Sequence, residues 1–189
     1  MKIVLKTAIT AAVFCMTAGV ALADAHATEN PMVGGAEMFA KKNIIENAIN
    51  SADHTTLVAA VQVAGLVETL SGPGPFTVFA PTNSAFAKLN QDEVANLLKP
   101  ENKTALTQIL TCHVVGAAAF SDAIKGMVDD DSGVHAVPTI GGCTLMAEYN
   151  GDTITLTDER GQVATVTVAD VAQSNGVIHV IDTVMLPKE

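Results

Sequence analysis

Apolar positions are spaced differently in the two halves of the chain. In the first half they recur every three or four residues, as on one face of a helix, and in the second half they alternate with polar residues, as in a strand. The expected helices span residues 36–50, 83–89, 92–98 and 102–110, with one more that Asp53 caps and that buries Leu57, Val58, Val61 and Leu66. The expected strands are residues 76–80, 112–115, 134–140, 143–149, 153–157, 164–171 and 177–186. Because the helices come first and the strands follow, the pattern predicts an α+β domain.

The expected last strand, residues 177–186, is apolar on both faces. Such a strand is typical of the centre of a sheet that is covered on both sides. His179 and Asp182 interrupt it, and His113 lies in the strand expected at residues 112–115. A buried polar group without a partner would cost about 1–3 kcal/mol, so each should have a hydrogen bond. We interpret all three as structural polar residues, with a catalytic or metal-binding role for a histidine as the alternative.

The N-terminal residues have the pattern of an export signal. Lys2 and Lys6 precede an apolar stretch, and the Ala-Leu-Ala of residues 21–23 supplies the small residues of a cleavage site. We expect a signal peptide at residues 1–23, with an uncleaved membrane anchor as the alternative. Residues 24–35 lack periodicity, which predicts a flexible lead, and the domain is expected at residues 36–187.

Charge narrows the possible partners. The chain has 10 basic and 20 acidic residues, a formal net charge of −10 at pH 7, and loss of Lys2 and Lys6 would leave 8 basic residues and a charge of −12. A negative surface repels phosphate backbones and anionic lipids, which argues against nucleic acid as a partner. No second apolar run approaches bilayer length, so we expect an exported chain without a membrane span, whether periplasmic, secreted or held at the cell surface.

Three cysteines are present, and Cys15 would leave with the signal peptide. In an oxidising compartment, Cys112 and Cys143 could form one disulfide, which would stabilise the fold by roughly 3–4 kcal/mol in the chain-entropy view. Two separate buried thiols are the alternative. The chain has no C-x-x-C, so the cysteines do not indicate a metal site.

Motifs of common enzymes are absent from the sequence. There is no G-x-S-x-G, no glycine-rich phosphate loop with Lys and Ser or Thr, and no H-E-x-x-H. The prolines of residues 72–75 remove N–H donors that a phosphate loop needs, and the acidic run at residues 129–131 lacks the ligand spacing of a calcium loop. We therefore expect no catalytic residue, no metal and no cofactor.

Two long segments resemble the signatures of the fasciclin-like domain family. Residues 76–86 read FTVFAPTNSAF, and residues 175–182 read NGVIHVID and are followed by Val184 and a Leu-Pro pair. Residues 110–115 between them are similar to the family's tyrosine-histidine segment, except that Cys112 stands where the family has tyrosine. The Ala-rich leader is similar to bacterial ones. The resemblance implies helices in the N-terminal half packed on a wedge of two mainly antiparallel sheets.

By the same resemblance, the chain is a cell-adhesion or protein-interaction module that binds a surface receptor, a matrix component or another copy of itself. Asp170 and Val171 occupy the place of an Asp-Ile dipeptide to which integrin recognition is assigned in animal relatives, with the strand around His113 helping to hold the surface. The alternative is that Asp170 only ends a strand. On the first interpretation, Asp170→Ala weakens attachment without changing thermal stability. A different function that stays open is an envelope protein that carries or senses a small apolar ligand.

Overall fold

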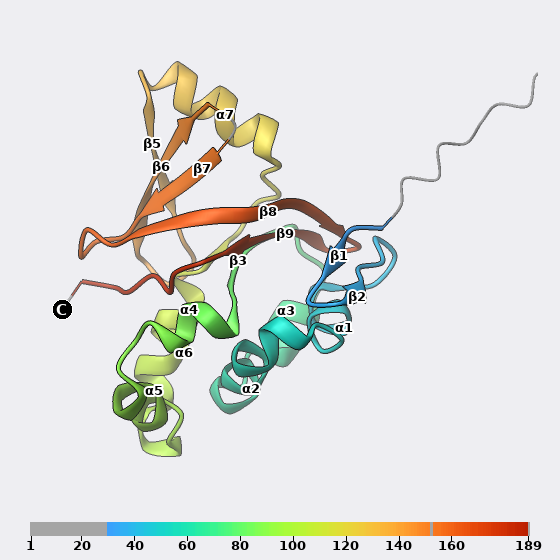
Figure 1. Cartoon of the computed structure of the whole chain (residues 1–189), viewed down its shortest axis with the longest axis vertical. Coiled ribbons are helices and arrows are strands. Elements are labelled where there is room, and N and C mark those ends of the chain that lie inside the picture. Colours follow the sequence, from blue (N-terminus) through green and yellow to red (C-terminus); the bar gives the residue numbers. More distant parts are fainter. Residues whose placement is uncertain (1–29, 152, 189) are drawn as a thin grey trace, which may run out of the picture.

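The computed structural model describes residues 30–151 and 153–188. The expected signal peptide, residues 1–23, and the first part of the expected flexible lead lie outside the described residues. Element labels follow Figure 1, in which helices α1 to α6 lie below the strands β3, β8 and β9 and helix α7 lies above them.

Ordered structure begins before residue 36, where the domain was expected to start. Strands β1 (Met32–Val33) and β2 (Ala36–Glu37) form a hairpin, and Val33 is buried. The two glycines between them, Gly34 and Gly35, have φ of 58° and 75°, which suits the tight turn that matches strand twist. The prediction of a flexible lead as far as residue 35 is therefore wrong for the hairpin, and the glycine pair was its overlooked signal.

The first helix is much shorter than predicted. Helix α1 spans Ile44–Ala48 and begins at Asn43, whose side chain accepts a hydrogen bond from the Glu46 N–H while Glu46 accepts one from the Asn43 N–H. This capping box fixes the start of the helix. The preceding segment is held outside the helix, because the Asn47 side chain bonds both the N–H and the carbonyl of Phe39.

Four further helices of the first half lie where the apolar spacing predicted them: α2 (Thr55–Ala64), α4 (Asn83–Ala87), α5 (Gln91–Leu97) and α6 (Lys103–Thr111). Helix α3 (Val67–Ser71) was not predicted, and Asp53 does not cap α2, whose N-cap position is His54. Short 3₁₀ turns, Ala52–His54 and Pro100–Asn102, precede α2 and α6. Gly65, with φ of 74°, separates α2 from α3 because a left-handed residue ends a helix.

Another helix was missed. Helix α7 spans Ser121–Asp130, in a stretch where the sequence predicted only a solvated acidic turn at its end. Ile124 and Val128, four residues apart, are its buried residues. Ile124, Met127 and Val128 do follow helical spacing, but this apolar stripe covers little more than one turn and was overlooked.

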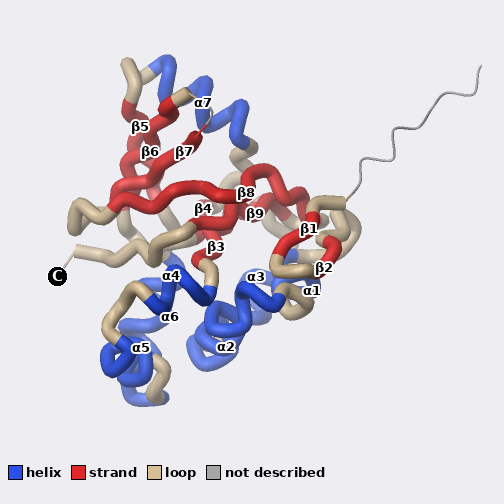
Figure 2. The backbone as a smooth tube through the Cα atoms, viewed as in Figure 1, coloured by secondary structure: helices blue, strands red, loops and turns tan. Residues whose placement is uncertain are grey.

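Seven strands of the described residues form a mixed sheet in the order β4-β3-β9-β8-β7-β6-β5. They are β3 (Phe76–Pro81), β4 (Val114–Val115), β5 (Val134–Pro138), β6 (Thr144–Asn150), β7 (Thr153–Thr157), β8 (Val163–Gln173) and β9 (Gly176–Ile181). β3 and β9 pair in parallel, and the other neighbours pair antiparallel. Long strand β8 belongs to both parts of the sheet, which meet along it as the two sides of the expected wedge (Figure 2).

Each part of the sheet has its own apolar core. Within the described residues, the first core lies between β3, β9 and helices α1 to α4 and α6, and the second lies between β5 to β8 and α7. Ile178 and Val180 of β9 belong to the first core, whereas Ile181 belongs to the second. The central, doubly covered position of the last strand is confirmed, but the strand ends at Ile181 and not at residue 186.

In the part of the chain that the structure describes, no helix has the length and apolar character needed to cross a membrane.

Candidate functional site

Asp170 lies at an irregular point of β8. Between the paired positions Val168 and Val171, β8 advances by three residues while β9 advances by two. The extra residue of β8 forms a bulge. Asp170 takes a left-handed backbone conformation with φ of 60°, and its side chain is exposed. A non-glycine residue in this conformation is uncommon and is often found at functional sites.

The Asp170 carboxylate fixes the start of α7. One oxygen accepts a hydrogen bond from the Ser121 N–H at 2.7 Å, and the other accepts one from the Ser121 hydroxyl. An acidic group at a helix N-terminus satisfies a free N–H and interacts favourably with the helix dipole. Asp170 is therefore an anchor of this helix as well as an exposed charge.

His179 continues the same network from β9. Its Nδ1 accepts a hydrogen bond from the Asp170 N–H at 3.3 Å, so the ring carries its proton on Nε2, which donates to the Ala119 carbonyl at 2.8 Å. Burial lowers the pKa of His179, which favours the neutral ring. On β3, the Thr77 hydroxyl accepts from the Ala119 N–H at 2.8 Å and donates to the Ala117 carbonyl at 2.6 Å. Three strands thus hold the segment that leads into α7.

Val171 and His113 do not reach the surface. Val171 is 0% exposed and belongs to the first core, because the bulge turns only its neighbour Asp170 outward. His113 is 2% exposed; its Nε2 accepts from the Met185 N–H at 3.0 Å, so its Nδ1–H donates to the Ile109 carbonyl at 2.8 Å. Burial lowers the pKa of His113 to about 4. The prediction that these two side chains take part in a contact surface is corrected by their burial.

Asp182 lies just after β9 and has three hydrogen-bond partners. Its carboxylate accepts from the Thr165 N–H at 2.8 Å, from the Lys88 ammonium at 3.2 Å and from the Thr183 hydroxyl at 3.1 Å. Partial burial raises the pKa of Asp182, but the hydrogen bonds from Thr165 and Lys88 lower it more, so that it lies below its ordinary value.

Cys112 and Cys143 form a disulfide, with their Cα atoms 5.3 Å apart. Both are buried, and the bond ties the end of α6 to the loop before β6. Gly141 in that loop lies against α6, since an added Cβ there would be 2.6 Å from the Cys112 nitrogen. At the position where the family has a tyrosine, this chain therefore has a cysteine that is bonded to Cys143.

At the start of α7 is a surface groove that sequence reasoning did not find. It has a volume of about 420 Å³ and lies between residues 73–75, the segment before α7 and the turn from β8 to β9. Phe120, next to Ser121, lines it and is 43% exposed. Asn175 makes one wall rigid, because its side chain donates to the carbonyls of Leu70 and Gly72 at 2.8 and 2.9 Å. The sequence offered no signal for Phe120 beyond one apolar residue before a helix.

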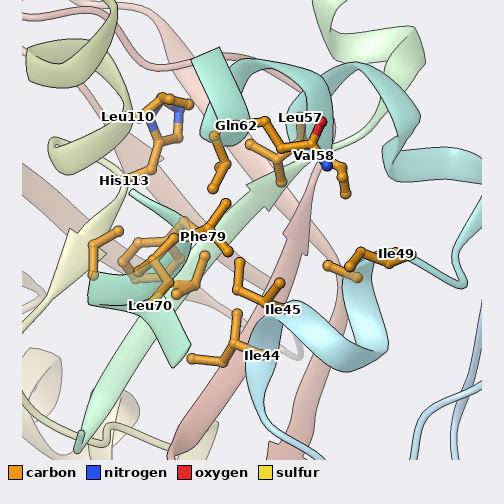
Figure 3. Close-up of a pocket in the computed structure, with 15 residues that line it drawn as sticks. Ile44, Ile45, Ile49, Leu57, Val58, Gln62, Leu70, Phe79, Leu110 and His113 are labelled. Carbon is orange, nitrogen blue, oxygen red and sulfur yellow. The ribbon is translucent and has the colours of Figure 1, made fainter. Parts of the chain in front are cut away.

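A second concave feature lies between α1, α2, α3 and β3. It is an apolar crevice of about 60 Å³, shown in Figure 3 with Ile45 and Phe79 directed into it and Ile49 at the end of α1. Ile49 is 57% exposed although it lines the crevice, so the apolar surface extends to solvent. His113 also lines it but has both ring nitrogens bonded, and it offers a ligand no free polar atom.

The fold and these sites define an α+β module with a rigid surface around Asp170. Comparison with known proteins assigns the family: the Fasciclin domain matches residues 52–187, and the chain belongs to this family. The chain is 43% identical over 192 residues to protein sll1483 of Synechocystis sp., covering 98% of this chain and 96% of that protein. It is also 37% identical over 131 residues to transforming growth factor-beta-induced protein ig-h3 of Sus scrofa, covering 69% of this chain but only 17% of the longer protein.

Among solved structures, one similar chain is described as a FAS1 domain pair from the insect cell adhesion molecule Fasciclin I. It is 25% identical, with a TM-score of 0.49, and the match covers 75% of this chain and 43% of that one.

Proposed function

We propose that this chain is an exported adhesion or protein-interaction module, and that its contact surface is centred on Asp170 and Phe120. The observation that carries the proposal is the network around Asp170: its exposed carboxylate accepts hydrogen bonds from Ser121, and its backbone N–H, at a residue with φ of 60°, donates to His179. A surface that is already rigid loses little conformational entropy on binding. The partner is a cell-surface or matrix protein, or a second copy of the chain.

The surface combines one charge with one aromatic ring. Phe120 is exposed and is the chain neighbour of Ser121, whose N–H and hydroxyl bond the Asp170 carboxylate. Exposed aromatic side chains are enriched among the residues that dominate protein interfaces. His113, Asp182 and the disulfide are assigned to holding this surface and not to contacting the partner.

Asp170→Asn tests the role of the charge. Asparagine tolerates the left-handed conformation, and its amide oxygen can still accept a hydrogen bond from Ser121, so the surface keeps its shape while the charge is lost. We expect cell attachment to surfaces coated with the protein to weaken about tenfold, which corresponds to about 1.4 kcal/mol of lost binding free energy. Unchanged attachment would remove the Asp170 charge from the contact surface.

Ser121→Ala is the matched control. It removes the hydroxyl that bonds Asp170 but leaves the charge exposed and the Ser121 N–H bond available. Attachment is expected to stay near the wild-type level. Loss of attachment in both variants, together with a drop in the unfolding midpoint, would mean that the effect is structural.

The apolar crevice of Figure 3 supports a second candidate function, in which the protein carries or senses a small apolar ligand. Its lining is almost wholly apolar, as the walls of small-molecule sites usually are. Native mass spectrometry of protein purified from its own source should then show added mass that extraction with organic solvent removes. Protein with only the mass of its polypeptide would count against this function.

The export route is part of the proposal. Cleavage after Ala23 would give a mature chain that starts at Asp24, and N-terminal sequencing of the protein from the culture medium or periplasm tests this assignment.

A further inference from the structure

Strands β5 to β8 have one face against α7 and one face toward solvent. The first face belongs to the second core, which also includes the buried residues of α7 (Figure 1). On the opposite face, which we call the outer face, the side chains are exposed or half-buried. A sheet face in water is usually polar, yet the outer face has Val134, Met146 and Val163, which are 39%, 37% and 53% exposed.

The strand register arranges the outer face in two rows across the four strands. Opposite residues of paired antiparallel strands have their side chains on the same face. From β5 to β8, the first row is Ala136, Met146, Thr157 and Val163. The second row is Val134, Glu148, Thr155 and Thr165. Glu148 is the one charged residue of these eight.

The first row is complementary to itself when its order is reversed. A two-fold axis along the strands, midway between β6 and β7, lays β6 of one copy over β7 of another and β5 over β8. Met146 then faces the smaller Thr157, and the exposed Val163 faces the small Ala136. Two sheets pack in this way about 10 Å apart, with their strands within about 30° of each other.

Charge favours a second copy as the partner of this face. The chain has a formal net charge of −10, so two copies repel each other unless they meet through a surface with few charges. In the arrangement above, Glu148 faces the Thr155 hydroxyl, which can donate to it, and the two carboxylates are not opposed. A highly charged partner would have its charges buried without counter-charges against the outer face.

The size of the outer face indicates a weak complex. Four strands about 4.8 Å apart, each with about five residues at about 3.3 Å, give a footprint of roughly 320 Å² from each copy. Side-chain relief raises the accessible area of the pair toward about 1,000–1,200 Å², the lower end for specific interfaces. Complexes of this size are transient.

We propose that two copies of the chain pair reversibly through the outer face of β5 to β8, with Met146 of each copy against Thr157 of the other. The pairing does not depend on the contact surface around Asp170. Asp170 lies seven positions beyond Val163 along β8, about 20 Å away, so a pair displays two such surfaces.

Sedimentation equilibrium of the purified protein at concentrations up to about 1 mM tests the pairing, since we expect a dissociation constant on the order of 0.1–1 mM. A tenfold rise in NaCl concentration should tighten the dimer about threefold, because salt screens the repulsion between acidic copies. In NMR spectra, the Met146 methyl signal should shift with protein concentration, and an NOE between copies should join Met146 to Thr157.

Two substitutions on the outer face should act in opposite directions. Met146→Glu adds a carboxylate to the face and should weaken the dimer about tenfold, whereas Glu148→Gln removes one and should tighten it about threefold. Thr104→Glu and Glu101→Gln are the matched controls, because they make the same charge changes at exposed positions in and before α6. Both controls should stay near the wild-type dissociation constant. If Met146→Glu does not fold, Glu148→Gln decides the question.

A single monomeric species at every concentration and salt level overturns the pairing. A dimer that weakens with added salt, or that Met146→Glu leaves intact, overturns it as well. Asp170→Asn should leave the dimer unchanged. If Asp170→Asn dissociates the dimer, the copies meet through the contact surface of the proposed function and not through the outer face.

Discussion

Buried histidines join distant segments of this protein. His113 bonds the Met185 N–H across 72 residues of sequence, and His179 bonds the Asp170 N–H and the Ala119 carbonyl. In each ring one nitrogen must accept and the other must donate, which requires the neutral form. Protonation would break the accepting bond and leave a charge in the interior.

The protein should therefore lose stability in mild acid. The pKa of His113 is about 4 in the fold and 6.5 in the unfolded chain, so the unfolded state binds more protons between these values. Stability is fully present above pH 6.5 and falls as the pH drops toward 4, by about 3 kcal/mol for this group. His54 and His179 shift in the same direction.

Urea unfolding of the wild type and His113→Gln at pH 7 and pH 4.5 measures the contribution of His113. The variant should be less stable at pH 7 but should lose less stability on acidification. Equal losses in both proteins would contradict the assignment. Comparing the two proteins cancels the titration of the carboxylates they share.

At the scale of single elements, β8 and α7 depend on each other through Asp170. The bulge in β8 turns Asp170 outward, and the carboxylate then bonds the first turn of α7. α7 covers the second core with Ile124 and Val128, so loss of the cap weakens that core as well. The earlier expectation that Asp170→Ala leaves thermal stability unchanged therefore needs revision.

Substitutions at Asp170 should differ in stability in a set order. Asp170→Ala removes the cap of α7, which lowers stability by about 1 kcal/mol. It also forces alanine into the left-handed backbone conformation, which lowers stability by about 1 kcal/mol more. Asp170→Gly also removes the cap, but glycine adopts the left-handed conformation freely. Asp170→Asn keeps a side-chain acceptor for the cap and tolerates the same conformation. Chemical denaturation should give wild type and asparagine as the most stable, then glycine, then alanine. A glycine variant less stable than alanine would show that the backbone conformation is not a constraint.

At the scale of the whole molecule, the disulfide links the two cores. Cys112 follows α6 of the first core, and Cys143 precedes β6 of the second. Because 31 residues separate them in sequence, the bond removes considerable freedom from the unfolded chain. It also holds the two parts of the wedge on either side of β8.

Removing the disulfide should lower the free energy of unfolding by roughly 3 kcal/mol. The double variant Cys112→Ala, Cys143→Ala and the reduced wild-type protein should unfold at similar, lower denaturant concentrations. Intact mass under non-reducing conditions should be about 2 Da below the reduced mass, since bond formation removes two hydrogens. Two free thiols in the native protein would rule out the bond.

Much of this fold follows from local sequence. The periods of apolar residues located helices α2, α4, α5 and α6 and strands β3 to β9, because helix and strand periodicity depend on near neighbours. The segments 76–86 and 175–182 identified the family, and β3 and β9 lie side by side within them. Local reasoning failed at β1–β2, where a glycine pair was overlooked, and at α7, where the apolar stripe is short.

The pairing of polar atoms could be decided only by the tertiary structure. The sequence indicated that His179, His113 and Asp182 need partners, but those partners come from segments that converge only in the fold. The same holds for Asp170 and Val171, which are neighbours in sequence: a bulge exposes the first, and the core buries the second. Near neighbours determine the period of a strand, whereas distant contacts decide where that period is interrupted and which side chains face solvent.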